Sequence, residues 1–167
     1  MNILFVCTAN VCRSVMAEAL FIRTMLLHKS ARTMFEISSA GVDALIGATP
    51  DAETVAVCAE HAIDVTCHQA RQLTAEMIGQ SDLVLCMAED HKRLILSAYP
   101  RFKDRVFLLL EYGHQKPPKK LSIDDPTGRS RRKYVKCYAK IEEEIERIHK
   151  RMMIPTEGTM PTIAVSR

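Results

Sequence analysis

A cysteine and an arginine are separated by five residues near the start of the chain, in the stretch CTANVCRS. Cys7 follows an apolar run at residues 3–6, and Arg13 precedes a segment with apolar residues at helical spacing. In a turn from a strand to a helix, unpaired N–H groups and the helix dipole stabilise an anion or a thiolate. The planar guanidinium of Arg13 can bind two phosphoryl oxygens at once. These residues predict phosphoryl transfer through a cysteinyl-phosphate.

The residues between this cysteine and this arginine can curl into a cradle of backbone N–H donors around the phosphoryl oxygens. Asn10 tolerates the left-handed conformation that such a curl needs, and the hydroxyl of Ser14 can cap the helix or donate to the thiolate. A nucleotide-type loop, G-x-x-x-x-G-K-[ST], is excluded because the first glycine of the chain is Gly41. The expected phosphate-binding loop comprises Thr8, Ala9, Asn10, Val11, Cys12 and Ser14.

A thiolate that attacks a phosphate ester needs a general acid, because the leaving oxygen must be protonated. The long polar loop before the last predicted helix contains SIDDPTG. Asp125 precedes Pro126, which restricts Asp125 to extended backbone conformations, and Gly128 then gives the chain freedom to enter the helix. Asp125 is the candidate acid, with an ordinary Asp-Pro turn as the alternative interpretation.

The elements that must position these residues alternate between strand and helix. This pattern predicts an α/β fold with three layers, α/β/α, and a mostly parallel sheet whose ligands bind at the carboxyl ends of the strands. Thr74 and Gly79 are expected to begin and end a short helix, and Glu142 to Glu146 to form a solvated helix face. The predicted strands are residues 3–6, 35–38, 83–87 and 106–110, and the predicted helices are residues 14–27, 51–61, 73–79, 89–98 and 130–152.

Composition narrows the class of protein. The 167 residues fit one domain, 47% are hydrophobic, and a formal net charge of +3 is too small to indicate nucleic-acid binding. No apolar stretch has the length of a membrane span and no signal peptide is visible, so we expect a cytoplasmic protein that binds no membrane. The six cysteines lack the close pairs of zinc sites. We therefore expect no metal and no cofactor.

The segments LFVCTANVCRSVMAEAL and DDPTG together resemble the low-molecular-weight protein tyrosine phosphatase family. SSAGV, ATPD, HQARQL and DLVLCM are also similar to this family, in the same order along residues 1–150. The resemblance implies a four-stranded parallel sheet in the order 2-1-3-4, with the cradle at its switch point. We expect a phosphatase-like domain at residues 1–152 and a mobile tail at residues 153–167.

The resemblance also implies a role for each site residue. Cys7 would be the nucleophile, Arg13 would bind phosphate and stabilise the transition state, and Asp125 would protonate the leaving group and then activate water. Asn10 would keep the loop in shape. Supporting roles are implied for Ser14, which would keep the nucleophile ionised, for Ser39 and His68, which would donate hydrogen bonds to Asn10, and for Cys12, which would form a reversible disulfide with Cys7.

Substrate preference depends on departures from the family pattern. Ala9 and Val15 stand where glycine and proline are frequent, and both are tolerable. Val11 is apolar, whereas members that act on phosphoarginine tend to be polar there. Thr127 stands where an aromatic residue usually lines the pocket, which weakens the expectation of a phosphotyrosine preference. Tyr112 or Tyr134 could supply that ring.

We therefore expect a phosphatase that acts on a phosphorylated protein, with phosphotyrosine favoured, or on a small phosphomonoester, as a monomer or weak homodimer. A thiol-based arsenate reductase is one alternative, but Cys86 lies in an apolar strand and Arg93 stands where a second cysteine is needed. A non-catalytic phosphopeptide-binding module is another. The basic residues Arg129, Arg131, Arg132 and Lys133 could steer acidic substrates or form a solvated face.

Overall fold

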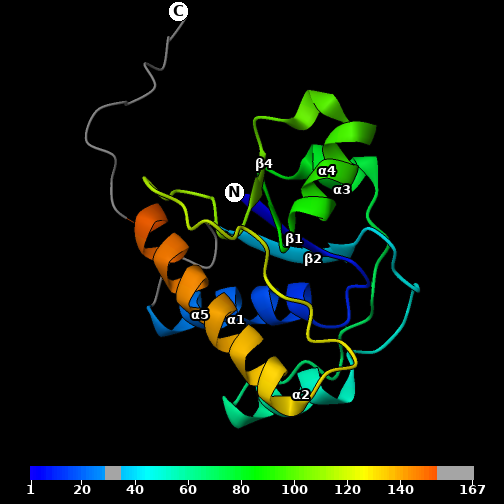
Figure 1. Ribbon diagram of the computed structural model, residues 1–167, viewed down its shortest axis with the longest axis vertical. Helices are drawn as coiled ribbons and strands as arrows, with labels where there is room; N and C mark the ends of the chain where they lie inside the picture. Colours follow the sequence, from blue (N-terminus) through cyan, green and yellow to red (C-terminus); the bar gives the residue numbers. More distant parts are fainter. Residues whose placement is uncertain (29–34, 154–167) are drawn as a thin grey trace, which may run out of the picture.

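The computed structural model describes residues 1–28 and 35–153 (Figure 1). Of the tail predicted at residues 153–167, Met153 ends the last helix and residues 154–167 lie outside the described part. Each predicted strand and helix is present; the helix at residues 89–98 has the predicted ends, and the other elements differ at one or both ends. In chain order the elements are β1 (Asn2–Cys7), α1 (Arg13–Leu27), β2 (Glu36–Gly41), α2 (Ala52–Glu60), α3 (Ala75–Gln80), β3 (Leu83–Cys86), α4 (Glu89–Ala98), the 3₁₀ turn η1 (Pro100–Phe102), β4 (Val106–Leu108) and α5 (Arg131–Met153).

The four strands form one parallel sheet in the order β2-β1-β3-β4, which confirms the expected topology. All four residues of β3 are buried, as expected for a strand covered on both faces. The last strand ends at Leu108 rather than at residue 110, because the chain turns there: the N–H groups of Glu111 and Tyr112 donate to the Leu108 carbonyl.

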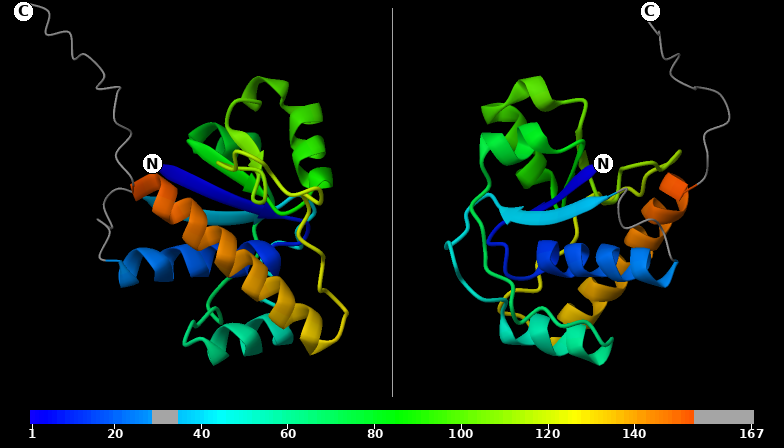
Figure 2. Two further views of the ribbon diagram at one scale, coloured as in Figure 1. Left: turned by 60° about the vertical axis from the view of Figure 1, so that its left-hand side comes forward. Right: turned by 180° about the vertical axis from the view of Figure 1, so that it is seen from behind.

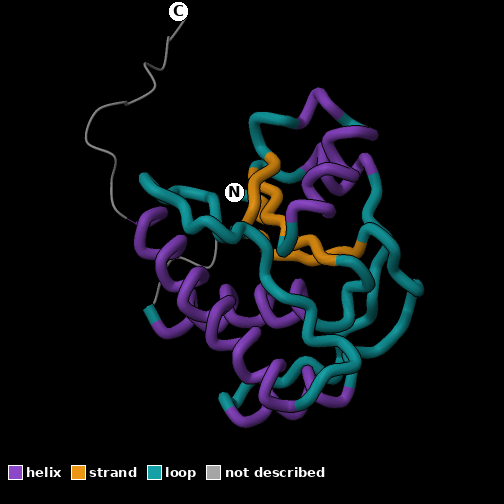
Figure 3. Tube along the Cα trace, viewed as in Figure 1, coloured by secondary structure: helices purple, strands orange, loops and turns teal. Residues whose placement is uncertain are grey.

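Helices cover both faces of the sheet (Figures 2 and 3). Phe5 of β1 packs in a core with α1 and α5, whereas its neighbours Leu4 and Val6 face the other way, toward α3 and α4. The connection from β1 therefore runs to one face and the connection from β3 to the other. In parallel α/β sheets, ligands bind where neighbouring strands send their connections to opposite faces, and here that point lies at the carboxyl ends of β1 and β3.

Helix ends follow local sequence signals. The side chain of Asp51 caps α2 by accepting from the Thr54 N–H, and Thr74 caps α3 by accepting from the Met77 N–H. Gly79 does not end α3 as predicted, since that helix continues to Gln80. No helix among the described residues has the length and apolar composition that crossing a membrane requires.

Candidate active site

The loop from Cys7 to Arg13 joins the end of β1 to the start of α1. Asn10 has φ 56°, so the left-handed conformation expected from the sequence is present. The Cys7 side chain is buried, and its Sγ lies 3.0 Å from Oγ of Ser14. The loop therefore curls tightly and places the thiol beside a hydroxyl at the helix start.

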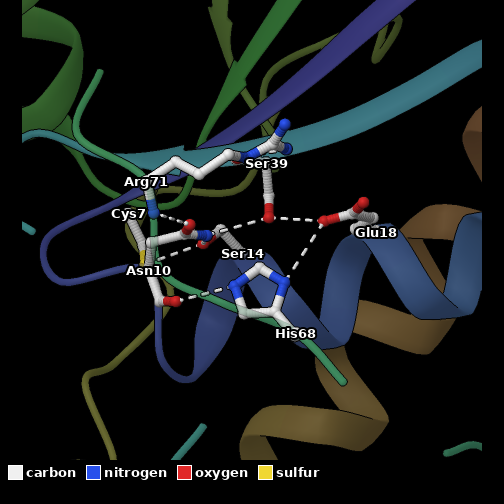
Figure 4. Close-up of polar contacts among 7 residues, drawn as sticks. All are labelled: Cys7, Asn10, Ser14, Glu18, Ser39, His68 and Arg71. Carbon is white, nitrogen blue, oxygen red and sulfur yellow. Dashed lines mark hydrogen bonds and ion pairs between the residues drawn. The ribbon is translucent and has the colours of Figure 1, made fainter. Parts of the chain in front are cut away.

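Asn10 is the most highly connected residue of this loop (Figure 4). Its Nδ2 donates to Oγ of Ser14 at 2.9 Å and to Oγ of Ser39 at 2.8 Å, and its Oδ1 accepts from the Arg71 N–H at 2.9 Å. Nε2 of His68 lies 3.0 Å from the Asn10 carbonyl, so that nitrogen is the donor. The structure thus brings together Asn10, Ser39 and His68, but the Ser39 hydroxyl accepts from Asn10 instead of donating to it.

Glu18 of α1 completes this network and was not identified from the sequence. Its Oε2 accepts from Oγ of Ser39 at 2.5 Å and lies 4.0 Å from Nδ1 of His68. Arg71 was also missed: its Nη2 donates to the Ser39 carbonyl at 2.8 Å. Both residues lie within segments that resemble the family, but the groups that they contact depend on how distant segments meet.

Gly41, at the end of β2, allows the loop to approach the sheet. A Cβ atom at Gly41 would lie 2.4 Å from the Thr8 carbonyl oxygen and 2.9 Å from the Asn10 nitrogen. The Val42 N–H donates to the Cys7 carbonyl, and the Asp43 N–H donates to the Thr8 carbonyl. These carbonyls are therefore turned toward the segment after β2, which leaves the N–H groups of the curl free to face an anion.

Arg13 and Asp125 are in contact although 112 positions separate them. Nη2 of Arg13 donates to Oδ2 of Asp125 at 2.5 Å and to Oγ1 of Thr8 at 3.2 Å, while Nη1 donates to the Ile123 carbonyl at 3.3 Å. The arginine side chain is 6% exposed and the aspartate side chain 46% exposed. Oδ1 of Asp125 accepts from the N–H of Thr127, so the acid lies at the rim of the cradle.

The remaining cysteines of this region lie in apolar surroundings. Burial raises the pKa of the Cys12 thiol well above its usual range, and burial, partly offset by Arg13, raises that of Cys137 to about 12. Burial also raises the pKa of Cys86 to about 12. All six cysteines are free. Of the two positions considered for an arsenate reductase relay, Cys86 packs in a buried apolar cluster and Arg93 pairs with Asp90, so they offer no pair of accessible thiols.

The missing aromatic residue is not replaced by either tyrosine considered from the sequence. Thr127 is exposed. Tyr134 is 3% exposed and donates to Oδ2 of Asp51, and the ring of Tyr112 packs against Phe107 with centroids 5.4 Å apart. Tyr134 is buried, and Tyr112 is partly buried against the core. The acid loop, residues 122–128 around Asp125, therefore presents a threonine where the family usually presents an aromatic ring.

The basic residues that follow Gly128 make two different kinds of contact. Arg131 donates to Glu53 at 2.8 Å and to Glu60 at 2.6 Å, which ties α5 to α2. Lys133 and Lys136 instead line a cavity of about 360 Å³ between the acid loop and α5, together with Asp125 and Pro126. No residue of the phosphate-binding loop lines this cavity, so it lies beside the cradle and not inside it.

His91 of α4 is a further residue that sequence reasoning missed. It is 4% exposed, and its Nε2 lies 3.0 Å from Oγ1 of Thr8. Burial, together with the positive charge of Arg13, lowers the pKa of His91 to about 4. The sequence around His91 does not predict this contact. The contact arises because α4 follows β3, and the end of β3 lies beside the end of β1, where the cradle begins.

The comparisons with known proteins agree with this geometry. The family model described as low molecular weight phosphotyrosine protein phosphatase matches residues 2–155. The chain is 33% identical to the low molecular weight protein-tyrosine-phosphatase Wzb of Escherichia coli K12, over 84% of this chain and 88% of that protein. It is 35% identical to the protein-arginine-phosphatase of Bacillus subtilis strain 168, over 91% of this chain and 97% of that protein.

A solved structure shows the same fold. A Cys-to-Ser variant of the arginine phosphatase YwlE, with a phosphorylated active-site serine, superposes with a TM-score of 0.85. The two chains are 33% identical, and the match covers 93% of this chain and 98% of that one.

Proposed function

Because the chain belongs to the low molecular weight phosphotyrosine protein phosphatase family, we propose that Cys7 attacks phosphorus, Arg13 binds the phosphoryl oxygens and Asp125 transfers protons. The family and its relatives are phosphatases, so the protein is a hydrolase of phosphorylated substrates that uses a cysteine. The observation that supports the assignment most directly is the loop at the end of β1, with a buried thiol, a left-handed asparagine and a buried arginine.

The first step forms one bond and breaks another. The thiolate of Cys7 attacks phosphorus, the S–P bond forms, and the bond from phosphorus to the leaving oxygen breaks while Asp125 gives that oxygen a proton. Ser14 supports the thiolate: its oxygen accepts from Asn10, so its own proton is available to Sγ at 3.0 Å. Arg13 stabilises the charge on the phosphoryl oxygens.

The second step returns the enzyme to its starting state. The Asp125 carboxylate takes a proton from water, the resulting oxygen attacks phosphorus, and the S–P bond breaks to release phosphate and the thiolate. In the structure, Nη2 of Arg13 donates a hydrogen bond to the Asp125 carboxylate. A phosphoryl group bound by Arg13 would compete for that nitrogen and free the carboxyl to reach the leaving oxygen.

Phosphorylated tyrosine in proteins is the substrate class that we favour, since Val11 presents an apolar wall at the cradle. Phosphoarginine is the second candidate, supported by the similarity to a protein-arginine-phosphatase over 91% of this chain. The exposed Thr127 supplies no ring to either substrate.

Turnover of p-nitrophenyl phosphate by the wild type and by Cys7→Ser tests the chemistry. We expect the wild type to turn over and the variant to be inactive, and a wild type without turnover would refute the proposed mechanism. Phosphate release from one peptide carrying phosphotyrosine or phosphoarginine then separates the substrates. Faster release from the phosphoarginine peptide would overturn our preferred substrate class but not the cysteine mechanism.

A further inference from the structure

His91 is a buried histidine at the edge of the cradle that the steps above do not use. It lies in the first turns of α4 and is 4% exposed. Its Nε2 is 3.0 Å from Oγ1 of Thr8, the residue directly after the nucleophile. The same hydroxyl lies 3.2 Å from Nη2 of Arg13. One hydroxyl therefore links this histidine to the arginine of the phosphate site.

The hydrogen-bonding capacity of Thr8 limits what His91 can do. A hydroxyl has one proton and two lone pairs, and a guanidinium only donates, so Arg13 occupies one lone pair. His91 either donates to the second lone pair or accepts the hydroxyl proton. That choice decides whether Thr8 keeps a proton that it can offer to another group.

The other ring nitrogen favours the first arrangement. Nδ1 of His91 is buried and has no hydrogen-bond partner within the described part of the chain. If Nε2 accepted from Thr8, the neutral ring would carry its proton on Nδ1, which would bury an unpaired N–H donor. Buried unpaired donors are rarer in folded proteins than unfilled acceptors. The neutral ring is the relevant form near pH 7, because burial and Arg13 lower its pKa to about 4.

The opposite side of the cradle shows the same arrangement. Nδ2 of Asn10 donates to the hydroxyl oxygen of Ser14, which leaves the Ser14 proton for Sγ of Cys7. In both cases a buried side chain fills a lone pair of a hydroxyl that lies beside a reacting group or its binding residue. The two hydroxyls differ in target, since Ser14 faces the nucleophile and Thr8 lies beside Arg13.

We propose that His91 is a positioning residue of the phosphate site, which donates from Nε2 to Thr8 and so leaves the Thr8 hydroxyl proton available to a phosphoryl group held by Arg13. The inference rests on the proposed function. His91 transfers no proton and forms no bond in the reaction. It acts only through Thr8, whose hydroxyl would otherwise turn its proton toward the histidine.

A double-mutant cycle with His91→Leu and Thr8→Val tests this role. The readouts are kcat and KM for p-nitrophenyl phosphate, and the inhibition constant of inorganic phosphate. A hydrogen bond to a charged group corresponds to roughly a 10- to 100-fold change in binding. We expect His91→Leu to weaken phosphate inhibition about tenfold when Thr8 is present and less than about twofold in the Thr8→Val background.

Rescue by a side chain that keeps the donor is the second arm. The amide of His91→Gln places an N–H near the position of Nε2, so we expect it to restore most of the phosphate affinity. His91→Asn, whose shorter amide cannot reach Thr8, should behave like His91→Leu, and it replaces that variant if His91→Leu does not fold. The matched control is His149→Leu, which removes another buried histidine, on α5, and should leave both constants unchanged.

Two results would overturn the proposal. One is an equal loss from His91→Leu in both Thr8 backgrounds, and the other is a Gln variant that melts like the wild type yet binds phosphate as weakly as the Leu variant. If the wild type turned over no ester, the proposed function would fail instead. The same cycle would then be measured by direct calorimetric titration with inorganic phosphate, which requires no turnover.

Discussion

The cradle and the acid loop contribute to one site but are supported very differently. Asn10 in the cradle is 0% exposed and bonds through both atoms of its side-chain amide, whereas the Asp125 side chain is 46% exposed. Asp125 accepts only from Arg13 and from the N–H of Thr127 among the described residues. The cradle is thus held in shape without substrate. Asp125, the proton donor, instead bonds to Arg13, the residue that must also bind the phosphoryl group of the substrate. Phosphate binding and placement of the acid are therefore coupled through Arg13.

Removing the Asp125 carboxylate should have the largest effect, and it should change catalysis and phosphate binding in opposite directions. We expect Asp125→Asn to lower kcat for p-nitrophenyl phosphate by about 10²–10⁴-fold, because leaving-group protonation is lost. The same variant should bind inorganic phosphate more tightly than the wild type, since Nη2 of Arg13 no longer carries a competing anion. Steady-state kinetics with phosphate as inhibitor measure both effects. Weaker phosphate binding would mean that the Arg13–Asp125 pair supports the cradle instead of competing with it.

Disturbing the cradle should affect stability as well as rate. We expect Asn10→Ala to lower the free energy of unfolding by about 3–4 kcal/mol, because it removes the donor to the Ser39 hydroxyl, leaves the Arg71 N–H unpaired and puts alanine at φ 56°. Asn10→Gly removes the same hydrogen bonds but tolerates that φ. Urea unfolding should place the glycine variant between alanine and wild type. Equal stability of all three proteins would show that the cradle does not depend on this side chain.

Local features of the site were readable from the sequence. The turn from β1 to α1, the left-handed Asn10 and the Thr74 cap on α3 each depend on residues close together in the chain, so spacing and residue type suffice. The strand order was expected only from the family resemblance.

Contacts between distant segments were not readable. Glu18 and His91 show ordinary helical patterns, and only the packed fold brings them to Ser39 and Thr8. The prediction was most clearly wrong at Glu144, because the run from Glu142 to Glu146 was predicted to be a solvated face. Glu144 is 2% exposed and contacts three basic side chains, those of Lys140, Arg147 and His114. Periodicity reports which face a helix residue occupies but not which partners make burial of its charge acceptable.

Acid should weaken the cradle side of the site through His91. Burial and the charge of Arg13 lower its pKa from 6.5 to about 4, against the opposing effect of Asp125 and Asp90. The unfolded chain therefore binds this proton at a higher pH than the folded protein, so the free energy of unfolding falls as pH drops from about 6.5 to about 4, by roughly 3 kcal/mol at most. Urea unfolding of wild type and His91→Gln between these pH values measures the contribution. A stability difference between the two proteins that stays constant with pH would contradict it.

A substitution at Thr127 in the acid loop should have the smallest effect, and it should act on aryl substrates alone. A tyrosine at position 127 would add the ring that the family usually carries there, and stacking contributes about 0.5–1.5 kcal/mol beyond buried area. We therefore expect Thr127→Tyr to lower KM for phenyl phosphate by about 2- to 10-fold, with KM for an alkyl phosphate unchanged, because the cradle itself is untouched. Thr127→Leu is the matched control, since it adds apolar area without a ring. If the leucine variant improves phenyl phosphate as much as the tyrosine variant does, the gain comes from apolar area alone. The threonine would then set how apolar the rim is, and an aromatic substrate would need no stacking partner on the acid loop.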